Sequence, residues 1–254
     1  MRHKKKLGQN FLVDKNIIEK IIKNINPSNK DCVIEIGPGD GALTKYICAK
    51  VNNLIIIEKD IDLIDELLLV VKNNKKTKIY NIDVLKFDFS SINSKMRVIG
   101  NLPYNISTEI IFKLCNIKNI VDMHFMLQRE VVDRIISNAN NKVYGRLSVM
   151  AQTYFYIKKL FDVSENVFVP KPKVKSSFIR LVPKNNIFDD RKHEIYFSKI
   201  VRSAFEARRK MIRSSLSNYL TNEDFIKIGI DSEFRAENLT VEDYLSISRH
   251  VKEI

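Results

Sequence analysis

The residues best suited to chemistry in this sequence are the tetrapeptide Asn101, Leu102, Pro103 and Tyr104. The lone pair of an adenine N6 amine is delocalised into the ring, which makes that nitrogen a weak nucleophile. The side-chain oxygen of Asn101 and the backbone carbonyl of Leu102 can accept both amine hydrogens, which favours a tetrahedral, positively charged transition state. Pro103 fixes the backbone without an N–H group, and Tyr104 offers a flat face for stacking. The tetrapeptide therefore predicts methyl transfer to an exocyclic amine.

A glycine-rich turn and two acids are spaced as in an adenosine-binding site. Gly37, Gly39 and Gly41 follow the apolar run 33–36, in a string that also fits a dinucleotide pattern. Glu58 closes the next apolar run, where an acid can accept both hydroxyls of a ribose. Asp83 follows a third run and can accept a hydrogen bond from the adenine amine. The three together favour S-adenosylmethionine over NAD, while the alternatives are a solvated carboxylate for Glu58 and a turn-forming role for Asp83.

An extrahelical target base needs a face on each side. Tyr104 supplies one, and we predict that Phe168 supplies the other, because the neighbouring Pro170 and Pro172 suit a rigid exposed loop. The alternative is a core phenylalanine under that loop. Lys171, Lys173 and Lys175 alternate, so they share a face of an extended segment and can line a phosphate track.

The elements that must position these residues alternate along the chain. Short β-rich runs and helical segments of about ten residues follow one another up to about residue 184, which predicts an α/β fold with a mostly parallel sheet covered on both faces. A helix follows Asp14 as its N-cap. From residue 185 the pattern is helical, so we place a domain boundary between residues 1–184 and 185–254. The functional residues above fall where strands end, where ligands bind in such sheets.

Charge indicates the class of partner. The 254 residues include 43 Lys and Arg against 30 Asp and Glu, a net charge of +13, and residues 185–254 are neutral, so the surplus lies in residues 1–184. This surplus predicts a polyanionic partner, with codon drift toward Lys, Asn and Ile as the alternative. Within residues 199–213 we expect one strongly basic helix.

Cysteine content and hydropathy set further bounds. Three isolated cysteines argue against disulfides and structural zinc and fit a reduced, intracellular compartment. The basic arm at residues 1–6 lacks the apolar stretch of a signal peptide, and no run approaches a membrane span. We therefore expect no metal, no membrane association and a cytoplasmic location.

The order of the short motifs resembles that of the KsgA-type rRNA adenine dimethyltransferases, and resistance-conferring large-subunit rRNA methyltransferases share this resemblance. It covers nearly the whole chain and rests on LGQNFL (7–12), EIGPGDGALT (35–44), IEKD (57–60), NLPYNIS (101–107), MLQREVVDRI (126–135), YGRLSVMAQ (144–152) and FVPKPKVKSSFIRL (168–181).

The resemblance implies a Rossmann-like S-adenosylmethionine-dependent methyltransferase domain and a small all-helical C-terminal domain that binds rRNA. It implies four methyl transfers to two adjacent adenines near the 3′ end of 16S rRNA, by a monomer that acts on an immature small ribosomal subunit. The implied cofactor contacts are Asn10, Leu12, Gly37, Glu58, Asp83 and Asn101, and the implied target-base site is Asn101 to Tyr104 with Phe168. The short basic arm departs from the family pattern, which puts some rRNA contacts in doubt.

Three alternatives stay open at this point. The first is a resistance-type methyltransferase for a large-subunit adenine, which the run NLPYNISTEIIF at 101–112 and the segment at 144–152 disfavour. The second is an RNA-binding assembly factor without catalysis, against which Glu58, Asp83 and the tetrapeptide argue. The third is a dehydrogenase, which the glycine turn permits but which makes no use of the tetrapeptide.

Overall fold

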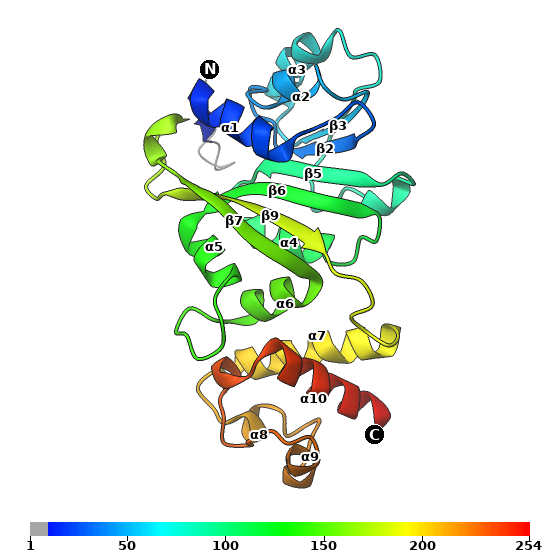
Figure 1. Ribbon diagram of the computed structural model, residues 1–254, viewed down its shortest axis with the longest axis vertical. Coiled ribbons are helices and arrows are strands. Elements are labelled where there is room, and N and C mark those ends of the chain that lie inside the picture. Colours follow the sequence, from blue (N-terminus) through cyan, green and yellow to red (C-terminus); the bar gives the residue numbers. More distant parts are fainter. Residues whose placement is uncertain (1–9) are drawn as a thin grey trace. The chain divides into compact units, whose positions relative to one another are not determined.

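The computed structural model of the chain describes residues 10–254 (Figure 1), so the basic arm and the start of the first motif lie outside the described residues. The described residues form two compact units, one of residues 10–132 with 157–183 and one of residues 133–156 with 184–254. Residues 133–156 therefore belong to the second unit. The sequence analysis had placed them in the first domain, because it expected a single boundary after residue 184. The reason is packing, since Tyr154 donates a hydrogen bond to Glu194 (3.0 Å) within the second unit.

The first unit is built on a seven-stranded sheet in the order β4-β3-β2-β5-β6-β9-β7. Neighbouring strands from β4 to β6 are parallel, and β9 runs antiparallel to β6. The predicted α/β class with a mostly parallel sheet is therefore confirmed. The strands are β2 (Cys32–Ile36), β3 (Asn53–Glu58), β4 (Lys78–Asn81), β5 (Met96–Asn101), β6 (Ile120–Gln128), β7 (Phe155–Val163) and β9 (Ser176–Pro183).

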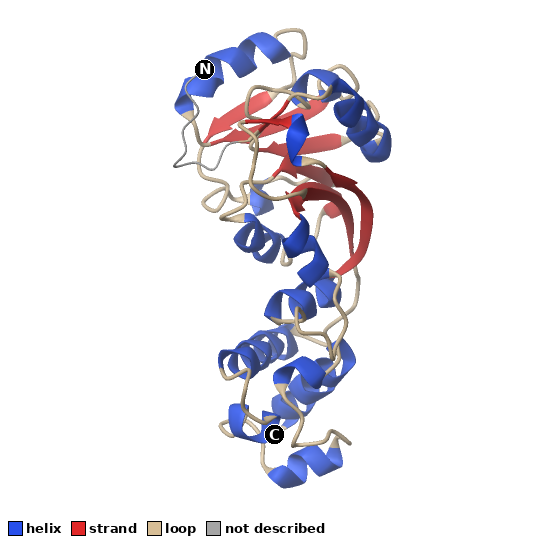
Figure 2. Ribbon diagram, turned by 90° about the vertical axis from the view of Figure 1, so that its left-hand side faces the viewer, coloured by secondary structure: helices blue, strands red, loops and turns tan. Residues whose placement is uncertain are grey.

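Helices lie on both sides of this sheet (Figure 2). The first begins after Asp14, whose side chain accepts a hydrogen bond from the backbone N–H of Ile17 (2.9 Å), so the predicted N-cap is confirmed. Its isoleucines recur at helical spacing and four of the five are buried, which holds the helix on the sheet. The helices are α1 (Lys15–Ile25), α2 (Thr44–Ile47), α3 (Ile64–Val71), α4 (Ser107–Leu114) and α5 (Arg129–Ile135).

The strand order reverses direction beside β2. The chain builds β3 and β4 on one side of β2 and then returns to place β5 and β6 on its other side. In open α/β sheets the crevice for a ligand lies at such a reversal, beyond the carboxyl ends of the strands. Here the glycine turn follows β2 and Asn101 closes β5, so both lie at the reversal.

A second, two-stranded sheet joins distant parts of the chain. Strand β1 (Phe11–Leu12) pairs antiparallel with β8 (Phe168–Val169), with Leu12 opposite Phe168. Strand β1 leads directly into α1, so this pairing fixes the entry of the described chain to the first unit. The backbone N–H of Val13 extends the pairing by donating to the carbonyl of Val167 (2.9 Å).

The second unit is helical around a core of apolar residues from its two longest helices. It contains the last residues of α5. Its complete helices are α6 (Arg146–Tyr154), α7 (Arg191–Glu206), α8 (Ile212–Ser215), α9 (Asn222–Lys227) and α10 (Val241–Glu253). Phe197 and Val201 of α7 and Tyr244 and Ile247 of α10 are fully buried. Thr240 caps α10 by accepting from the backbone N–H of Asp243 (3.2 Å), an arrangement typical of a stable N-terminus.

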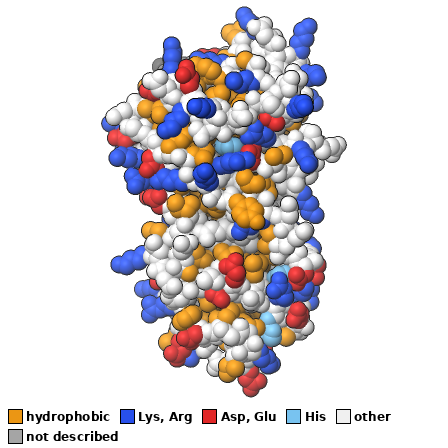
Figure 3. All heavy atoms as spheres, in the orientation of Figure 1, with side chains coloured by type: hydrophobic (Ala, Val, Ile, Leu, Met, Phe, Trp, Pro, Cys, Tyr) orange, Lys and Arg blue, Asp and Glu red, His pale blue; other side chains and the backbone are white. Residues whose placement is uncertain are grey.

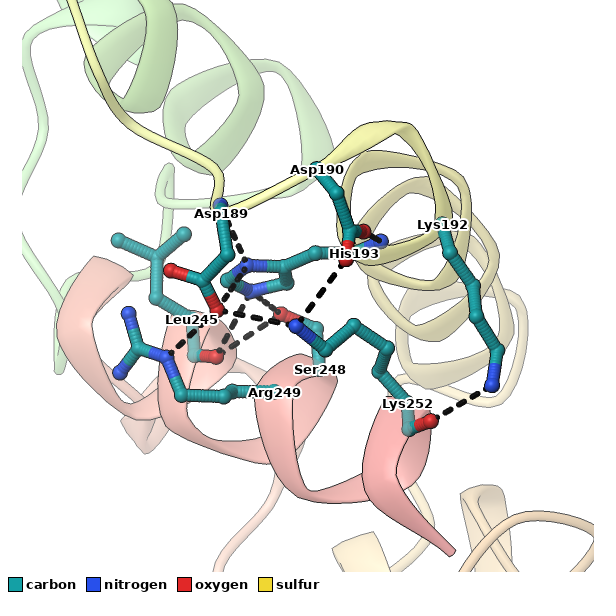
Figure 4. Close-up of polar contacts among 8 residues, drawn as sticks. All are labelled: Asp189, Asp190, Lys192, His193, Leu245, Ser248, Arg249 and Lys252. Atoms are coloured by element: carbon teal, nitrogen blue, oxygen red, sulfur yellow. Dashed lines mark hydrogen bonds and ion pairs between the residues drawn. The ribbon is translucent and has the colours of Figure 1, made fainter.

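A closed polar cluster joins α7 to α10 (Figure 4). The backbone N–H of Asp189 donates to Nδ1 of His193 (3.3 Å), so Nε2 carries the ring proton and donates to Oγ of Ser248 (2.9 Å). The Ser248 hydroxyl donates in turn to the carbonyl of Leu245 (2.9 Å). Around this chain, Lys252 contacts the carboxylates of Asp189 and Asp190 at 3.2 and 3.3 Å. Each polar side chain drawn in the cluster has at least one partner, which is typical of a structural role.

The expected single basic helix over 199–213 is wrong. Helix α7 ends at Glu206, and Arg208, Arg209 and Lys210 lie in the following turn, before Arg213 in α8. Acidic neighbours also bond several of these bases, since Arg208 contacts Glu237 (2.7 Å) and Arg202 contacts Glu206 (2.7 Å). Local charge counted along the sequence could not show the pair of Arg208 with Glu237, because Glu237 is distant in the chain.

The visible surface differs between the units in its charges. On the face in Figure 3, Lys and Arg are numerous over the first unit, whereas acidic and basic side chains are mixed over the second. This agrees with the neutral charge of residues 185–254. Within residues 10–254, no helix has both the length and the apolar character needed to cross a membrane.

Candidate active site

One pocket at the reversal of the sheet collects most of the predicted site residues. It is lined from the ends of β2, β3 and β5, from the segment after β4, and from the chain around β1. The predicted residues that line it are Asn10, Leu12, Gly37, Glu58, Asp83, Asn101, Leu102, Pro103 and Tyr104. Five segments that are far apart in the sequence therefore meet at one site.

The glycine turn lines the pocket through Gly37 and Gly39, directly after β2. Gly37, Gly39 and Gly41 all have positive φ angles, of 62°, 63° and 83°, which a side chain would strain. A Cβ atom on Gly39 would also lie 2.8 Å from the ring of Phe11. The turn thus needs glycine for its backbone conformation and for the close approach of β1.

Glu58 is a buried acid, and the alternative of a solvated carboxylate does not hold. Its side chain is 6% exposed, and its two oxygens accept from the backbone N–H groups of Asp60 (2.8 Å) and Gly39 (3.4 Å). Burial raises the pKa of Glu58 despite these bonds. Each carboxylate oxygen has a second lone pair, so Glu58 is fixed in place and can still accept from a ligand hydroxyl.

Asp83 has the turn-forming role that was the alternative, and it also lines the pocket. Its Oδ1 accepts from the backbone N–H of Leu85 (3.0 Å), which is the turn-forming bond. Its Oδ2 forms an ion pair with Nζ of Lys59 (2.8 Å), and this bond lowers the pKa of Asp83. Asp83 therefore lines the pocket as an ionised, oriented carboxylate.

Glu35 is a pocket residue that the sequence analysis missed. It lies inside β2, is 1% exposed, and accepts a hydrogen bond from the hydroxyl of Thr44 (2.8 Å). Burial is the main cause that raises its pKa to about 7, and the nearby charges of Glu58 and Asp40 add to it. An acid in an otherwise apolar strand directly before a glycine turn is the signal that could have identified it.

This set of acids fits a cationic adenosine cofactor better than a dinucleotide. Glu35, Asp40 and Glu58 surround the glycine turn, and burial raises the pKa of each. Buried acids without a cation are electrostatically costly, and a ligand with a sulfonium and an ammonium group relieves that cost. A diphosphate on the same turn would meet like charge instead.

The side chain of Asn101 is held at one end only. Its Nδ2 donates to the backbone carbonyl of Asn10 (2.9 Å), which turns Oδ1 away from Asn10. Neither Oδ1 nor the carbonyl of Leu102 accepts a hydrogen bond from another residue in the described part of the chain. Two acceptors at adjacent positions are thus available at the pocket.

The rest of the tetrapeptide is fixed by its neighbours. The backbone N–H of Leu102 donates to Met126 (3.1 Å), and the carbonyl of Pro103 accepts from Ile106 (3.2 Å). Tyr104 is partly buried and its hydroxyl lies 2.7 Å from Oγ of Ser176. A strand end, a turn and a side-chain bond therefore hold the four residues in place.

Phe168 does not lie where the sequence analysis placed it. Its ring is 2% exposed and belongs to a hydrophobic cluster with Phe11, Leu12 and Phe178, and it does not line the pocket. The expected exposed loop is wrong because β8 pairs with β1, which turns the ring into the core. In this structure Phe168 supports Leu12, and through β1 it supports the carbonyl of Asn10 that holds Asn101.

The three alternating lysines are exposed, as a phosphate track requires, but they do not belong to a strand. Lys171 forms an ion pair with Glu165 (3.7 Å), and the carbonyl of Lys175 accepts from the backbone N–H of Arg129 (2.9 Å). Lys173 has no ion pair with any residue from 10 to 254. The sequence predicted that the three lysines share a face of an extended segment, but no strand holds them on one face.

Comparison with known proteins shows what this arrangement is similar to. The family model described as ribosomal RNA adenine dimethylase matches residues 1–253. A protein of Francisella tularensis subsp. novicida named ribosomal RNA small subunit methyltransferase A is 46% identical over 252 residues, covering 96% of both chains. A protein of the same name from Nitrosospira multiformis is 41% identical over 260 residues, covering 100% of this chain and 99% of its own.

Solved structures agree on the fold. A dimethyladenosine transferase from Plasmodium falciparum superposes with a TM-score of 0.81 at 24% identity, covering 93% of this chain and 95% of its own. A 23S rRNA methyltransferase superposes with a TM-score of 0.73 at 22% identity, covering 95% and 99%. At these identities the likeness concerns the fold, whereas the family model and the relatives above 40% identity concern the lineage. The chain is a member of the ribosomal RNA adenine dimethylase family.

Proposed function

We propose that this enzyme transfers methyl groups from S-adenosylmethionine to the N6 amines of two adjacent adenines near the 3′ end of 16S rRNA, giving N6,N6-dimethyladenine. The observation that carries the proposal is the pair of available acceptors, Oδ1 of Asn101 and the carbonyl of Leu102, beside a pocket lined by buried acids. Family membership and the names of the relatives support the substrate class.

The residues of the chain bind and orient the reactants and accept hydrogen bonds from the amine in this reaction. When bound, the cofactor supplies an electrophilic methyl group on a sulfonium. The amine nitrogen would take up this methyl group, and the electron pair of the broken C–S bond would remain on the sulfur. Asn101 and Leu102 hold the two amine hydrogens, which directs the nitrogen lone pair toward the methyl carbon. The methylated nitrogen is acidic and loses a proton to water, so no strong base is required.

The acids of the pocket have separate parts in cofactor binding. Glu58 is proposed to accept from the ribose hydroxyls and Asp83 from the adenine amine, since both carboxylates are already oriented by backbone N–H groups. Glu35 and Asp40 offset the positive charge of the cofactor. This distribution disfavours the dehydrogenase alternative, in which a diphosphate would lie on the same turn.

The large-subunit alternative has weaker support. One neighbour is a 23S rRNA methyltransferase, but its 22% identity is half that of the small-subunit relatives. Primer extension on rRNA from a deletion strain separates the two. We expect the stop at the adenines near the 3′ end of 16S rRNA to disappear and to return with the wild-type gene. Persistence of that stop, with loss of one at a 23S adenine, would refute the assignment.

The partner and the setting are also part of the proposal. We infer a monomer that binds 16S rRNA in an immature small subunit in the cytoplasm; the names of the relatives support small-subunit rRNA as the partner. A role as a non-catalytic assembly factor is the less favoured function, because the available acceptors of Asn101 and Leu102 would then have no use. We therefore propose one enzyme that methylates 16S rRNA and also takes part in the biogenesis of the small subunit.

A further inference from the structure

A hydroxyl pair connects the tetrapeptide to a distant strand. Tyr104 follows β5, whereas Ser176 is the first residue of β9, and β6 lies between these two strands in the sheet. Their hydroxyl oxygens are 2.7 Å apart, the distance of a well-formed O–H···O bond. The side chain of Tyr104 therefore reaches beyond the end of β6 to a partner on the far side.

The burial of Ser176 shows that this contact is more than a surface bond. Ser176 is fully buried (0% exposed), and the Tyr104 hydroxyl is its hydrogen-bond partner within the described residues. Burying a hydroxyl is costly unless it is bonded, whereas a partly exposed tyrosine can satisfy its own hydroxyl with water. The fold thus carries a buried polar group whose bond fixes the far end of the Tyr104 ring.

The register around Ser176 is fixed independently of Tyr104. Ser176 lies opposite Gln128 of β6, and the backbone N–H of Arg129 donates to the carbonyl of Lys175 (2.9 Å). At the near end, the hydroxyl of Ser107 donates to the carbonyl of Tyr104 (3.3 Å). With both ends of the residue anchored, rotation of the ring about its side-chain bonds is restricted.

We propose that Ser176 is a positioning residue for methyl transfer, which sets the plane of the Tyr104 ring and thereby the placement of the stacked adenine. This inference rests on the proposed function, in which Tyr104 is the stacking face. An amine whose lone pair must meet a methyl carbon in line tolerates little displacement, and a shift of about 1 Å can cost about 100-fold in rate. Ser176 acts through Tyr104 and does not touch the reacting atoms.

The adjacent residue supplies a matched control. Ser177 is also fully buried, and its hydroxyl donates to Asp162 (2.6 Å) on the opposite face of β9. The variants Ser176→Ala and Ser177→Ala each remove one buried hydroxyl with one bond. They differ in whether that bond leads to the tetrapeptide.

The test is single-turnover and steady-state methylation of unmethylated small subunits by the full chain. We expect Ser176→Ala and Tyr104→Phe each to lower kcat about 10- to 100-fold, with KM for the subunit changed less than about threefold. The double variant should be no slower than either single variant, because both remove the same bond. Ser177→Ala should retain the wild-type kcat.

Three results would overturn the inference. They are a normal kcat for Ser176→Ala, multiplicative losses in the double variant, and an equal kcat loss for Ser177→Ala. If Ser176→Ala does not fold, Tyr104→Phe removes the same bond from its more exposed side, and a normal kcat for that variant would contradict the inference. A wild-type protein that leaves 16S adenines unmethylated would instead refute the proposed function.

Discussion

Two buried acids of the pocket, Glu35 and Glu58, and the acids of the second unit are in opposite electrostatic situations, whereas Asp83 of the pocket has an ion pair with Lys59. In the pocket, burial raises the pKa of Glu35 and Glu58, and neither forms an ion pair with a described residue. In the second unit, bonds from Lys252 and Arg249 lower the pKa of Asp189, and His250 lowers that of Asp224. The second group is satisfied by the protein itself, while the first retains capacity for a ligand.

The same contrast applies to the neutral polar groups. The hydrogen-bond chain from His193 through Ser248 to Leu245 closes on itself (Figure 4). Asn101 is bonded at Nδ2 and available at Oδ1. A polar group with one end fixed and one end available is oriented for function, whereas a group with both ends bonded contributes mainly to stability.

The largest effect should come from Asn101→Ala. It removes one of the two acceptors, and we expect kcat to fall about 100- to 1,000-fold, similar to removal of one oxyanion-hole donor. Cofactor affinity should change less, and the thermal midpoint should stay close to that of the wild type. Methylation of unmethylated small subunits with radiolabelled cofactor measures the rate. Near-normal turnover would rule out the two-acceptor mechanism.

Asn101→Asp sharpens this prediction through the bond to Asn10. An ionised carboxylate keeps its acceptors but cannot donate to the Asn10 carbonyl, so the side chain should turn away. We expect a loss close to that of the alanine variant at pH 8 and partial recovery as pH falls, when the protonated acid can donate. A pH profile parallel to that of the wild type would contradict the role of the Asn10 carbonyl.

Glu58→Ala tests the acids of the pocket directly. It should weaken binding of S-adenosylmethionine by about 1–3 kcal/mol through lost charge-assisted hydrogen bonds. Isothermal titration measures this change, with Asp189→Ala as the control that should leave affinity unaltered. An unchanged dissociation constant for Glu58→Ala would remove it from the cofactor site.

His193→Ala tests the opposite side of the comparison. It removes a fully buried ring and leaves Ser248 without its donor, so the free energy of unfolding should fall by about 1–3 kcal/mol. Cofactor affinity should not change. Denaturant unfolding measures the free energy of unfolding, and isothermal titration measures cofactor affinity. A large loss of cofactor affinity without loss of stability would contradict the proposed contrast between the pocket and the second unit.

Cofactor affinity should depend on pH because of Glu35. Its pKa in the folded protein is about 7, above the ordinary 4.5, so folding favours the neutral acid. The resulting stabilisation of the free protein is full below about pH 4.5 and is lost as pH rises through about 7. Binding of a cation favours the ionised form, so the dissociation constant should rise about tenfold from pH 8 to pH 6. The same titrations on Glu35→Gln should give a flatter profile; an equal slope would exclude Glu35 as the cause.

The smallest effect concerns rRNA binding by the basic residues of 199–213. Arg208 and Arg213 contact Glu237 and Glu233, whereas Arg209 and Lys210 have no ion pair with a residue in 10–254. Replacing Arg209 and Lys210 by Ala should lower the slope of log K against log salt by about one for each lost phosphate contact. Arg202→Ala, with its base already bonded to Glu206, should change the slope less. Equal slopes for all variants would assign these bases to the solvated surface.

Local patterns predicted the residues whose position depends on neighbours in sequence. Glu58 and Asp83 follow short apolar runs, and Asp14 precedes a helical repeat, so strand ends and the cap could be identified. Glu35 was missed because an acid within an apolar strand resembles a sheet position rather than a pocket residue. The sequence also carries no local sign that Asn10 would hold Asn101.

Pairing between distant segments accounts for the predictions that failed. The prolines after Phe168 suggested an exposed loop, but the ring is buried because β8 pairs with β1, more than 150 residues away in sequence. Ser176 lay within a noted motif, yet its bond to Tyr104 depends on the order of β5, β6 and β9. The basic stretch failed as one helix because α7 ends at Glu206.

The central claim is that the available acceptors at Asn101 and Leu102 serve dimethylation of two small-subunit adenines. Mass spectrometry of 16S rRNA, after incubation of unmethylated small subunits with purified protein and S-adenosylmethionine, tests it most directly. The account predicts a gain of four methyl groups on two adjacent adenines near the 3′ end, and far less methylation in the same incubation time with Asn101→Ala. Unmodified 16S rRNA, or equal modification by the Asn101→Ala variant, would contradict it.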